Sequence, residues 1–448
     1  MSISTDYARN DYSNSAVWRI AAPMIVSSVT VPLLGLVDTA VMGHLDDPAF
    51  LGAVAAGATI FAVLFMGLNF LRMGTTGITA QAFGAGNNDR LREALAQALV
   101  IALALAALIL LAQAVIGDFA VAALGPSENV AALTHEYFAI RIWSAPASLC
   151  NYVLIGWLIG MQNARGPLAI MLTTNAINIA LDLIFVVLLG MRVDGVALAT
   201  LLAELGGVLT GILFVRAELR GHPGSGAPMQ LFELSRYKRL FAMNANLLVR
   251  TMSLMFVFAF VTAQGARMGD VILAVNAILM NLQFFLAYAL DGIAYAAEAL
   301  VGKATGARDR EGLLLAVRRT LRWSLLFATG FCIVYWLAGG AIVDALSDIE
   351  SLRATARDYL PWMIASPLIS VWCFLYDGVF VGATRSREMM VVMAGSMLLV
   401  FLPTWFGLAE YGNHALWLAF LLFMGARGIG MHFWFRRLVK NDAFFFER

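Results

Sequence analysis

The chain has 448 residues, of which 61% are hydrophobic and 13% are charged. An average soluble domain is about 45–50% apolar and about 25% charged, so this composition excludes a soluble globular protein. The net charge of +1 provides no bulk field that would attract nucleic acid or an acidic partner. The five histidines and three cysteines show no metal-ligand spacing, and no nucleophile is placed beside a base, which argues against an enzyme.

Apolar runs of about 20 residues, the length that crosses a bilayer, recur along the whole chain. In lipid every backbone polar group must be satisfied within its own helix or in a closed barrel. The runs are continuous and much longer than the alternating strands that build barrels, so they predict helices. The expected fold class is an all-α polytopic membrane protein with twelve transmembrane helices, at 16–41, 50–78, 93–116, 132–158, 167–190, 195–217, 240–264, 271–297, 318–346, 356–381, 388–408 and 414–436.

The distribution of positive charge predicts the orientation, because lysine and arginine accumulate in cytoplasmic loops. With both termini in the cytoplasm, most of the 30 Lys and Arg residues fall in inside segments. Outside segments then hold only Arg192, Arg267, Arg353 and Arg357. We therefore expect a multi-pass protein with both termini cytoplasmic.

A polar segment rich in glycine and proline, residues 220–230, interrupts the chain near its middle. Its composition disfavours a helix and predicts a flexible linker. Six predicted spans lie on each side of it. We expect an N-terminal lobe at 1–219, a cytoplasmic linker at 220–239 and a C-terminal lobe at 240–448.

The two halves resemble each other at a constant offset of 222 residues. Gly84 corresponds to Gly306, and the pair Gly156 and Gly160 corresponds to Gly378 and Gly382. Because six spans is an even number, both halves insert the same way up, as parallel repeats. This predicts two six-helix bundles around a central cavity that opens alternately to each side.

The first span carries an acid near its outer end. A charge at the bilayer centre costs about 2.5–3.5 kcal/mol on insertion scales, so it is kept only when it is paired or used. Pro32, which precedes Asp38, removes a backbone donor and favours a kink. A kinked helix with an acid one and a half turns later could form a gated ion site. The alternative is an acid at a helix end that the outer interface wets.

The fifth span carries Asn175, Asn178 and Asp182. Residues three and four apart share a helix face, so two amides and a carboxylate point to one place. A polar stripe facing lipid is expensive, so this face should be directed to the bundle interior, as an ion or proton site or as interhelical hydrogen bonding. Thr200 of the sixth span could add a hydroxyl oxygen. Such hard oxygen ligands suit a proton or Na⁺ and not a soft metal.

The acidic cluster occurs only in the first half, since Asp182 corresponds to Thr404 and Asp38 to Phe260. Three other polar residues inside spans are candidates for an accessory or cavity-lining role: Asn151, Gln283 and Asp291. Asp291 is expected either to pair with Arg250 or to contact substrate. Asp377 is expected to pair with Arg427.

Short motifs at the ends of the spans carry a family resemblance. They are the segments 18–25, 36–44, 84–88, 162–167 and 306–309. In this order, and with two six-span halves, they resemble the multidrug and toxic compound extrusion (MATE) exporters, most closely the DNA-damage-inducible (DinF) branch. The NorM-like branch of that family carries acids in its seventh and tenth spans, where this chain offers only Asp377.

The resemblance implies an N-lobe cation site that couples entry of H⁺ or Na⁺ to export of apolar or cationic compounds. The family's first-span acid falls on Asp38, its fifth-span amide and acid on Asn178 and Asp182, and its sixth-span threonine on Thr200. Two neighbouring carboxylates favour protonation of one of them, which favours H⁺ over Na⁺. We expect no cofactor, no nucleic-acid partner, contact with membrane lipid, and a monomer in the bacterial inner membrane.

Two other transporter classes compete with this interpretation. A lipid-linked sugar or lipid flippase of the same superfamily needs a cationic cavity, and Arg72, Arg141 and Arg250, which lie inside spans, keep that hypothesis open. A major-facilitator transporter would carry a basic signature after its second span, and residues 84–90 do not match one.

Overall fold

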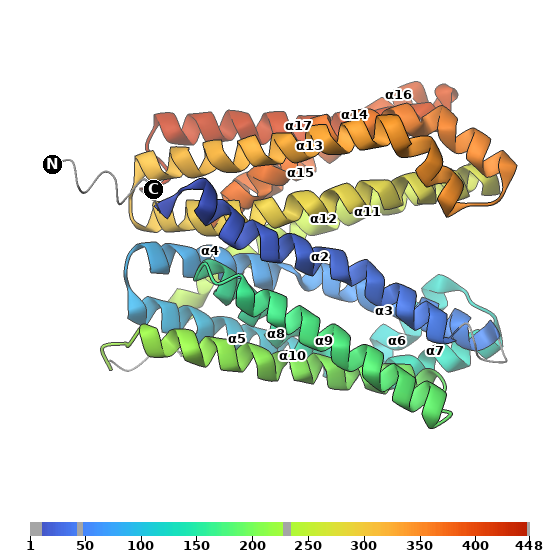
Figure 1. Ribbon diagram of the computed structural model, residues 1–448, viewed down its shortest axis with the longest axis horizontal. Coiled ribbons are helices and arrows are strands. Elements are labelled where there is room, and N and C mark those ends of the chain that lie inside the picture. Colours follow the sequence, from blue (N-terminus) through green and yellow to red (C-terminus); the bar gives the residue numbers. More distant parts are fainter. Residues whose placement is uncertain (1–10, 43–47, 227–233, 446–448) are drawn as a thin grey trace. The chain divides into compact units, whose positions relative to one another are not determined.

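The computed structural model describes residues 11–42, 48–226 and 234–445, and every regular element in these ranges is a helix (Figure 1). The first half of the chain forms α2 (Asn14–Met42), α3 (Pro48–Leu68), α4 (Phe70–Gly84), α5 (Asn88–Leu111), α6 (Gln113–Leu124), α7 (Glu128–Arg141), α8 (Ala145–Gly160), α9 (Arg165–Asp182) and α10 (Val193–Gly221). The second half forms α11 (Leu234–Arg267), α12 (Asp270–Gly306), α13 (Arg310–Leu346), α14 (Glu350–Gly382), α15 (Ser386–Ser396), α16 (Leu402–Leu408) and α17 (Asn413–Lys440).

The predicted spans correspond to these helices. Within the described ranges, 11 helical segments are long and apolar enough to cross a membrane, and α2 covers the first predicted span. Several helices run past the predicted ends, such as α13, which begins at Arg310 and not at 318. Charged residues continue a helix into the headgroup region, where hydropathy no longer marks it.

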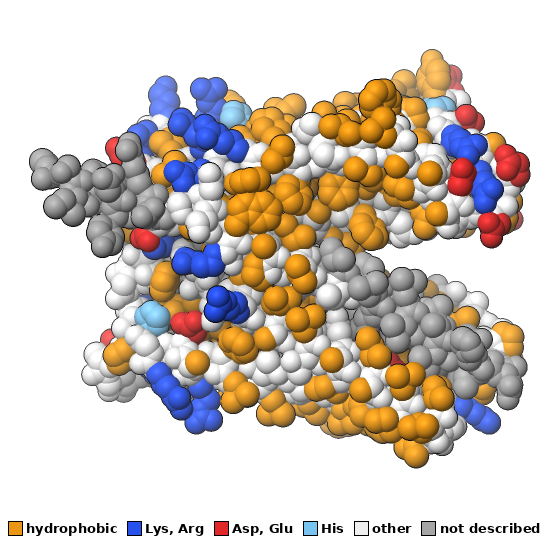
Figure 2. Space-filling view, viewed as in Figure 1, with side chains coloured by type: hydrophobic (Ala, Val, Ile, Leu, Met, Phe, Trp, Pro, Cys, Tyr) orange, Lys and Arg blue, Asp and Glu red, His pale blue; other side chains and the backbone are white. Residues whose placement is uncertain are grey.

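Large apolar side chains lie exposed along the helices, as expected of a surface that faces lipid. Leu111 is 86% exposed and Leu399 is 78% exposed. Figure 2 shows hydrophobic side chains over the middle of the visible helices and Lys and Arg side chains mainly toward their ends. An aqueous protein rarely leaves so much apolar surface open, so this pattern indicates a bilayer as the surrounding solvent.

Contacts divide the chain into two compact units. The N-terminal unit is Val26–Tyr237, and the C-terminal unit contains Lys238–Arg448 together with the residues up to Ile25. The boundary therefore falls inside α2. Trp18, in the first half of α2, packs edge-on against Trp323 of α13, with 4.9 Å between ring centroids. The first turns of α2 thus belong to the C-terminal unit.

The sequence repeat is also a structural repeat. Gly86 and Arg308, which are 222 positions apart, both adopt left-handed backbone angles, with φ of 64° and 54°. The residues that follow them, Asn87 and Asp309, both cap the next helix through a side-chain oxygen, at 2.9 and 2.8 Å. The loops after the second and the eighth span are therefore conformational copies.

One glycine in each unit marks a close contact between two helices. A Cβ added at Gly156 of α8 would lie 2.4 Å from the carbonyl oxygen of Arg72 in α4. A Cβ added at Gly378 of α14 would lie 2.4 Å from that of Ala294 in α12. Both residues of the second pair are 222 positions beyond those of the first. The same small-residue packing thus holds the fourth span on the second and the tenth on the eighth.

The beginning of the predicted linker is anchored to the start of α5. The backbone N–H of Ser225 donates to Asp89 Oδ1 at 2.8 Å. The Arg92 guanidinium donates to the carbonyl oxygens of Leu219 and His222, at 2.7 and 3.0 Å. Flexibility was expected along this whole segment, but these bonds hold its first residues in place. Residues 227–233 of the linker lie outside the described ranges.

Candidate functional site

A buried polar cluster lies between α9 and α10 in the N-terminal unit. Asn178 is 1% exposed and Asp182 is 0% exposed, whereas Leu183, the residue directly after Asp182, is 47% exposed. The Asn178 side-chain amide donates to Thr200 Oγ1 at 3.3 Å. The helix therefore directs its polar face inward, and the fifth and sixth spans meet at the residues that the sequence singles out.

The helix changes its geometry directly after the carboxylate. Residues Leu183–Leu188 form a π-helical turn that continues α9. Such turns are rare, and they occur frequently at functional sites. A carboxylate fully buried within a span is stable only when it is protonated or placed beside a cation or strong donors. Asp182 is thus a fully buried carboxylate within a span, next to a π-helical turn.

The polar face of α9 also contacts the second half of α2. The Asn175 amide lies 3.5 Å from the carbonyl oxygen of Thr30, and the Ser27 hydroxyl donates to the sulfur of Met171. Pro32 follows two residues after Thr30, so the Ser28 carbonyl lacks its usual intrahelical donor. The backbone of α2 is helical through Met42, but the side chains of Pro32 and Asp38 lie outside the described ones.

A second polar contact joins Asn151 of α8 to Glu204 of α10. Its amide donates to the backbone carbonyl of Glu204 at 3.0 Å and to the Glu204 carboxylate at 2.8 Å. Arg141, at the end of α7, interacts electrostatically with the same carboxylate. From the sequence, Asn151 is an accessory candidate, and Glu204 is an acid inside a span whose pairing with Arg72 or Arg141 stays open. The structure favours Arg141.

The C-terminal unit holds a buried, ion-paired carboxylate, Asp377. Arg427 of α17 binds Asp377 Oδ2 at 2.9 Å, which confirms the predicted pair. Arg250 of α11 binds the same oxygen, whereas its predicted partner was Asp291. Hydropathy marks the spans but not which helices are neighbours, so the partner of Arg250 could not be derived. Asp377 is thus already neutralised by two guanidinium groups.

The remaining candidates lie on α12. Gln283 is 2% exposed, and its side-chain oxygen accepts a hydrogen bond from Ser366 of α14 at 2.5 Å. Asp291 is half-buried and interacts electrostatically with Tyr288, one turn before it. Both residues belong to the C-terminal unit, whereas the cluster around Asp182 belongs to the N-terminal unit. Gln283 therefore contributes to the packing of α12 on α14.

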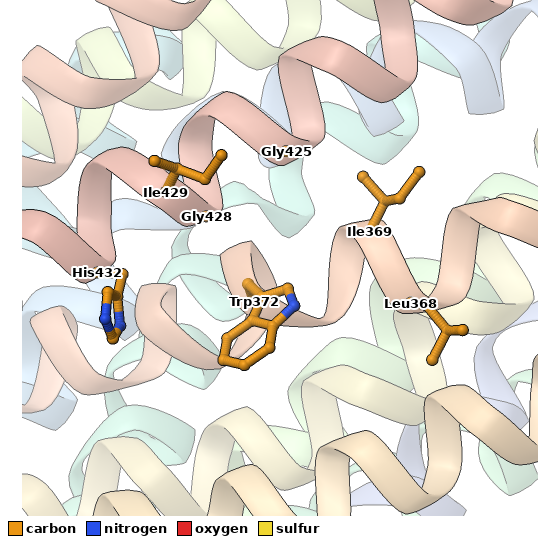
Figure 3. Close-up of a pocket in the computed structure, with 7 residues that line it drawn as sticks. All are labelled: Leu368, Ile369, Trp372, Gly425, Gly428, Ile429 and His432. Atoms are coloured by element: carbon orange, nitrogen blue, oxygen red, sulfur yellow. The ribbon is translucent and has the colours of Figure 1, made fainter.

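A cavity of about 450 Å³ lies between α14 and α17 in the C-terminal unit. Figure 3 shows its lining: Leu368, Ile369, Trp372, Gly425, Gly428, Ile429 and His432. Its one ionisable residue, His432, is hydrogen-bonded to the Tyr376 hydroxyl at 2.5 Å. No residue predicted for the site lines this apolar hollow.

Two units of apolar helices that repeat one plan, with buried titratable groups in their interior, define a membrane transporter and not an enzyme. The family model described as MatE matches residues 23–184 and 247–406. The DNA damage-inducible protein F of Escherichia coli is 46% identical over 97% of this chain and 94% of its own length. The chain therefore belongs to the MATE family of transporters.

Other relatives agree on the family and the fold. A probable multidrug resistance protein NorM of Thermotoga maritima is 27% identical over 71% of this chain and 69% of its own length. The solved outward-facing structure of a multidrug resistance MATE family transporter of the MOP superfamily matches with a TM-score of 0.83, at 20% identity, over 96% of both chains. At that identity, the structural match supports the fold alone.

Proposed function

We propose that this chain is an antiporter that exports small amphipathic or cationic compounds in exchange for an inward-moving cation, H⁺ in preference to Na⁺. The coupling cation binds at Asp38, Asn178, Asp182 and Thr200. The observation that carries this proposal is the fully buried carboxylate of Asp182 beside the contact between Asn178 and Thr200. The 46% identity to the DNA damage-inducible protein F and the multidrug resistance names of other relatives support the direction of transport.

Helix register supports a place for Asp38 in this site. The contact between Thr30 and Asn175 fixes one level shared by α2 and α9. From there, Asp38 lies eight residues further along α2, or about 12 Å, and Asp182 lies seven residues further along α9, or about 10.5 Å. In the proposed topology both helices run outward, so the two carboxylates lie at nearly the same depth.

The coupling follows from the different affinity of two conformations for the cation. A cation drives a conformational change only if it binds one state more tightly than the other. With the two carboxylates close together, binding a cation removes their repulsion and lets α2 bend at Pro32. Because α2 packs on both units, its bending changes the contacts of each. The lobes at 1–219 and 240–448 then alternate access, with the linker at 220–239 and both termini in the cytoplasm.

The chemistry of the proposed ligands favours H⁺ over Na⁺ as the coupling cation. The ligands available are carboxylate, amide and hydroxyl oxygens, which serve H⁺ and Na⁺ alike. A carboxylate can carry a proton without a complete coordination shell, whereas Na⁺ needs several oxygens at once. Two neighbouring carboxylates also favour protonation of one of them, so the proton is the simpler occupant.

The three arginines that would support a flippase each have a hydrogen-bond or ion-pair partner within their own unit. Arg72 donates to Asn69 at 3.2 Å, Arg141 donates to the Tyr137 hydroxyl at 2.5 Å, and Arg250 pairs with Asp377. A pyrophosphate-binding cavity needs guanidinium groups that are available to the ligand. The observed contacts favour an exporter over a flippase.

The test is transport in proteoliposomes with an imposed pH or sodium gradient. Wild-type protein should move a fluorescent lipophilic cation when the pH gradient alone is present. Asp38→Asn and Asp182→Asn should abolish this movement. Asp194→Asn should not, because it changes a half-buried acid at the start of α10 that accepts a hydrogen bond from the backbone N–H of Arg192. Equal transport by wild type and both site variants would show that the cluster does not couple a cation.

A further inference from the structure

Glu204 is a second acid on the helix that carries Thr200. Four residues separate them, so the two side chains share a face of α10 about 6 Å apart along its axis. The Glu204 carboxylate accepts a hydrogen bond from Asn151 of α8 at 2.8 Å. It also interacts with Ser148 of α8 and with Arg141 of α7. The carboxylate therefore lies in the interior of the N-terminal unit, one turn on the cytoplasmic side of Thr200.

Because Gly207 has no side chain, polar groups of α8, α9 and α10 meet close to Glu204. A Cβ at Gly207 of α10 would lie 2.4 Å from Thr174 Oγ1 and 2.9 Å from the Asn151 amide nitrogen. Thr174 is one turn before Asn178 on α9, on the same face. A polar track thus runs from Asn178 through Thr174 and Asn151 to the Glu204 carboxylate.

Several buried polar atoms along this track have no hydrogen-bond partner among the described residues: Asn178 Oδ1, Asn151 Oδ1, Ser144 Oγ and Arg141 Nε. Buried polar atoms are almost always paired, because leaving one unpaired is unfavourable. The four atoms belong to α9, α8, the short turn Ile142–Ser144 and α7 of one unit, and together they indicate a path that polar species enter. An apolar substrate would not satisfy these atoms, but a proton carried on hydroxyl groups and water would.

In the C-terminal repeat, the side chains at the corresponding positions contact one another. Ser144 and Ser148 correspond, 222 positions on, to Ser366 and Ser370, which are fully buried. There Ser366 donates to Gln283, and the two serine hydroxyls lie 3.3 Å apart. Asn151 corresponds to Cys373, and Glu204 to Ala426. The polar track is therefore particular to the unit that holds the predicted coupling site.

We propose that Glu204 is a second proton-carrying residue, which receives the coupling proton from Asp182 and passes it toward the cytoplasm. The proton leaves the Asp182 carboxyl group and moves along the hydroxyls of Thr200 or Thr174, each accepting one proton and releasing another. It ends on the Glu204 carboxylate and leaves Asp182 ionised. Arg141 is the charged group that faces Glu204 from α7, and it stabilises the carboxylate again once the proton has left. This inference rests on the proposed antiport and assigns its ion to H⁺.

The test compares Glu204→Gln with Glu218→Gln in proteoliposomes. Glu218 is a matched control, because it lies on the same helix and accepts a hydrogen bond from an asparagine, Asn163, at 2.6 Å. Glutamine keeps an acceptor for Asn151 but carries no transferable proton. Glu204→Gln should reduce transport driven by a pH gradient at least about tenfold. Its Kd for the fluorescent cation should stay within about twofold of the wild-type value. Glu218→Gln should match wild type in both measurements.

The pH profile separates proton transfer from a structural role. Glu204→Asp, which can carry a proton, should restore transport with a displaced pH profile, whereas Glu204→Gln should lose the pH dependence. Wild-type transport by Glu204→Gln, with Asp182→Asn inactive, would overturn the relay and leave the antiport intact. Loss of substrate binding together with transport in both Glu204 variants would also overturn it, because it would show a structural role. Activity in Asp182→Asn would contradict the proposed function itself.

Discussion

Thr200 is the residue through which α9 and α10 meet at the cluster. Its hydroxyl accepts from the Asn178 amide at 3.3 Å and donates to the Val196 carbonyl at 3.0 Å. Thr200→Ala should lower transport by about three- to tenfold and stability by about 1 kcal/mol, the typical size of an interhelical hydrogen bond in a membrane. Thr200→Ser should restore both in the same vesicle assay. If alanine and serine behave alike, the hydroxyl has no part in the site.

Asp377 has a structural task, although it is a buried acid, as the proposed coupling acid Asp182 also is. Two guanidinium groups bind one carboxylate oxygen, so Asp377→Asn would leave two charges with no counter-ion. Removing one partner of a buried ion pair destabilises a protein by about 3–5 kcal/mol. The purified Asp377→Asn variant should have a melting temperature well below that of wild type. Asp358→Asn, which changes an exposed acid on the same helix, should keep the wild-type melting temperature. If Asp377→Asn keeps its melting temperature but loses coupling, the coupling site lies in the C-terminal unit.

The contact glycines decide how closely helices pack. Gly156→Ala and Gly378→Ala each place a methyl group against a backbone carbonyl that cannot retreat. Overpacking of this kind costs about 1–3 kcal/mol, so both variants should melt at lower temperature. Gly330→Ala on α13 is the control, because its Cβ would meet open space. If the three variants melt alike, these contacts are looser than the structure indicates.

The helix α2 is the element that both units share. Pro32→Ala restores the N–H that the Ser28 carbonyl lacks and should straighten the helix. We expect transport to fall about tenfold while substrate binding is kept, since bending and not affinity is affected. The measurement is transport beside Kd in the same preparation. Normal transport by this variant would exclude a bend at Pro32 from the mechanism.

The sequence predicts the helices better than their interruptions. Each predicted span corresponds to a helix, because an apolar run of bilayer length has no other stable structure in lipid. The breaks at Asn69 and Ala112 and the π-helical turn at Leu183 were not predicted. Hydropathy averages over many residues, and such breaks depend on a few backbone hydrogen bonds that neighbouring helices supply. The ends of the helices were missed for the related reason that charged residues extend them.

At the scale of the whole molecule, the internal repeat carried most of the predictive power. The offset of 222 residues predicts equivalent roles for Gly156 and Gly378. In the structure, both glycines lie against backbone carbonyl groups that are also 222 residues apart. The asymmetry of the acids was equally visible, with Asp182 opposed by Thr404. Pairing between helices was harder, as Arg250 and Glu204 show, because it depends on which faces meet in three dimensions.

The central claim is that the buried cluster around Asp182 releases a cation when substrate binds. The direct measurement is the pH change of an unbuffered solution of purified protein when the fluorescent cation is added, followed with an indicator dye. The wild-type protein should release about one proton per bound substrate, in line with exchange at one site, and Asp182→Asn should release none while still binding. Proton release that is absent in wild type, or unchanged in Asp182→Asn, would contradict the account.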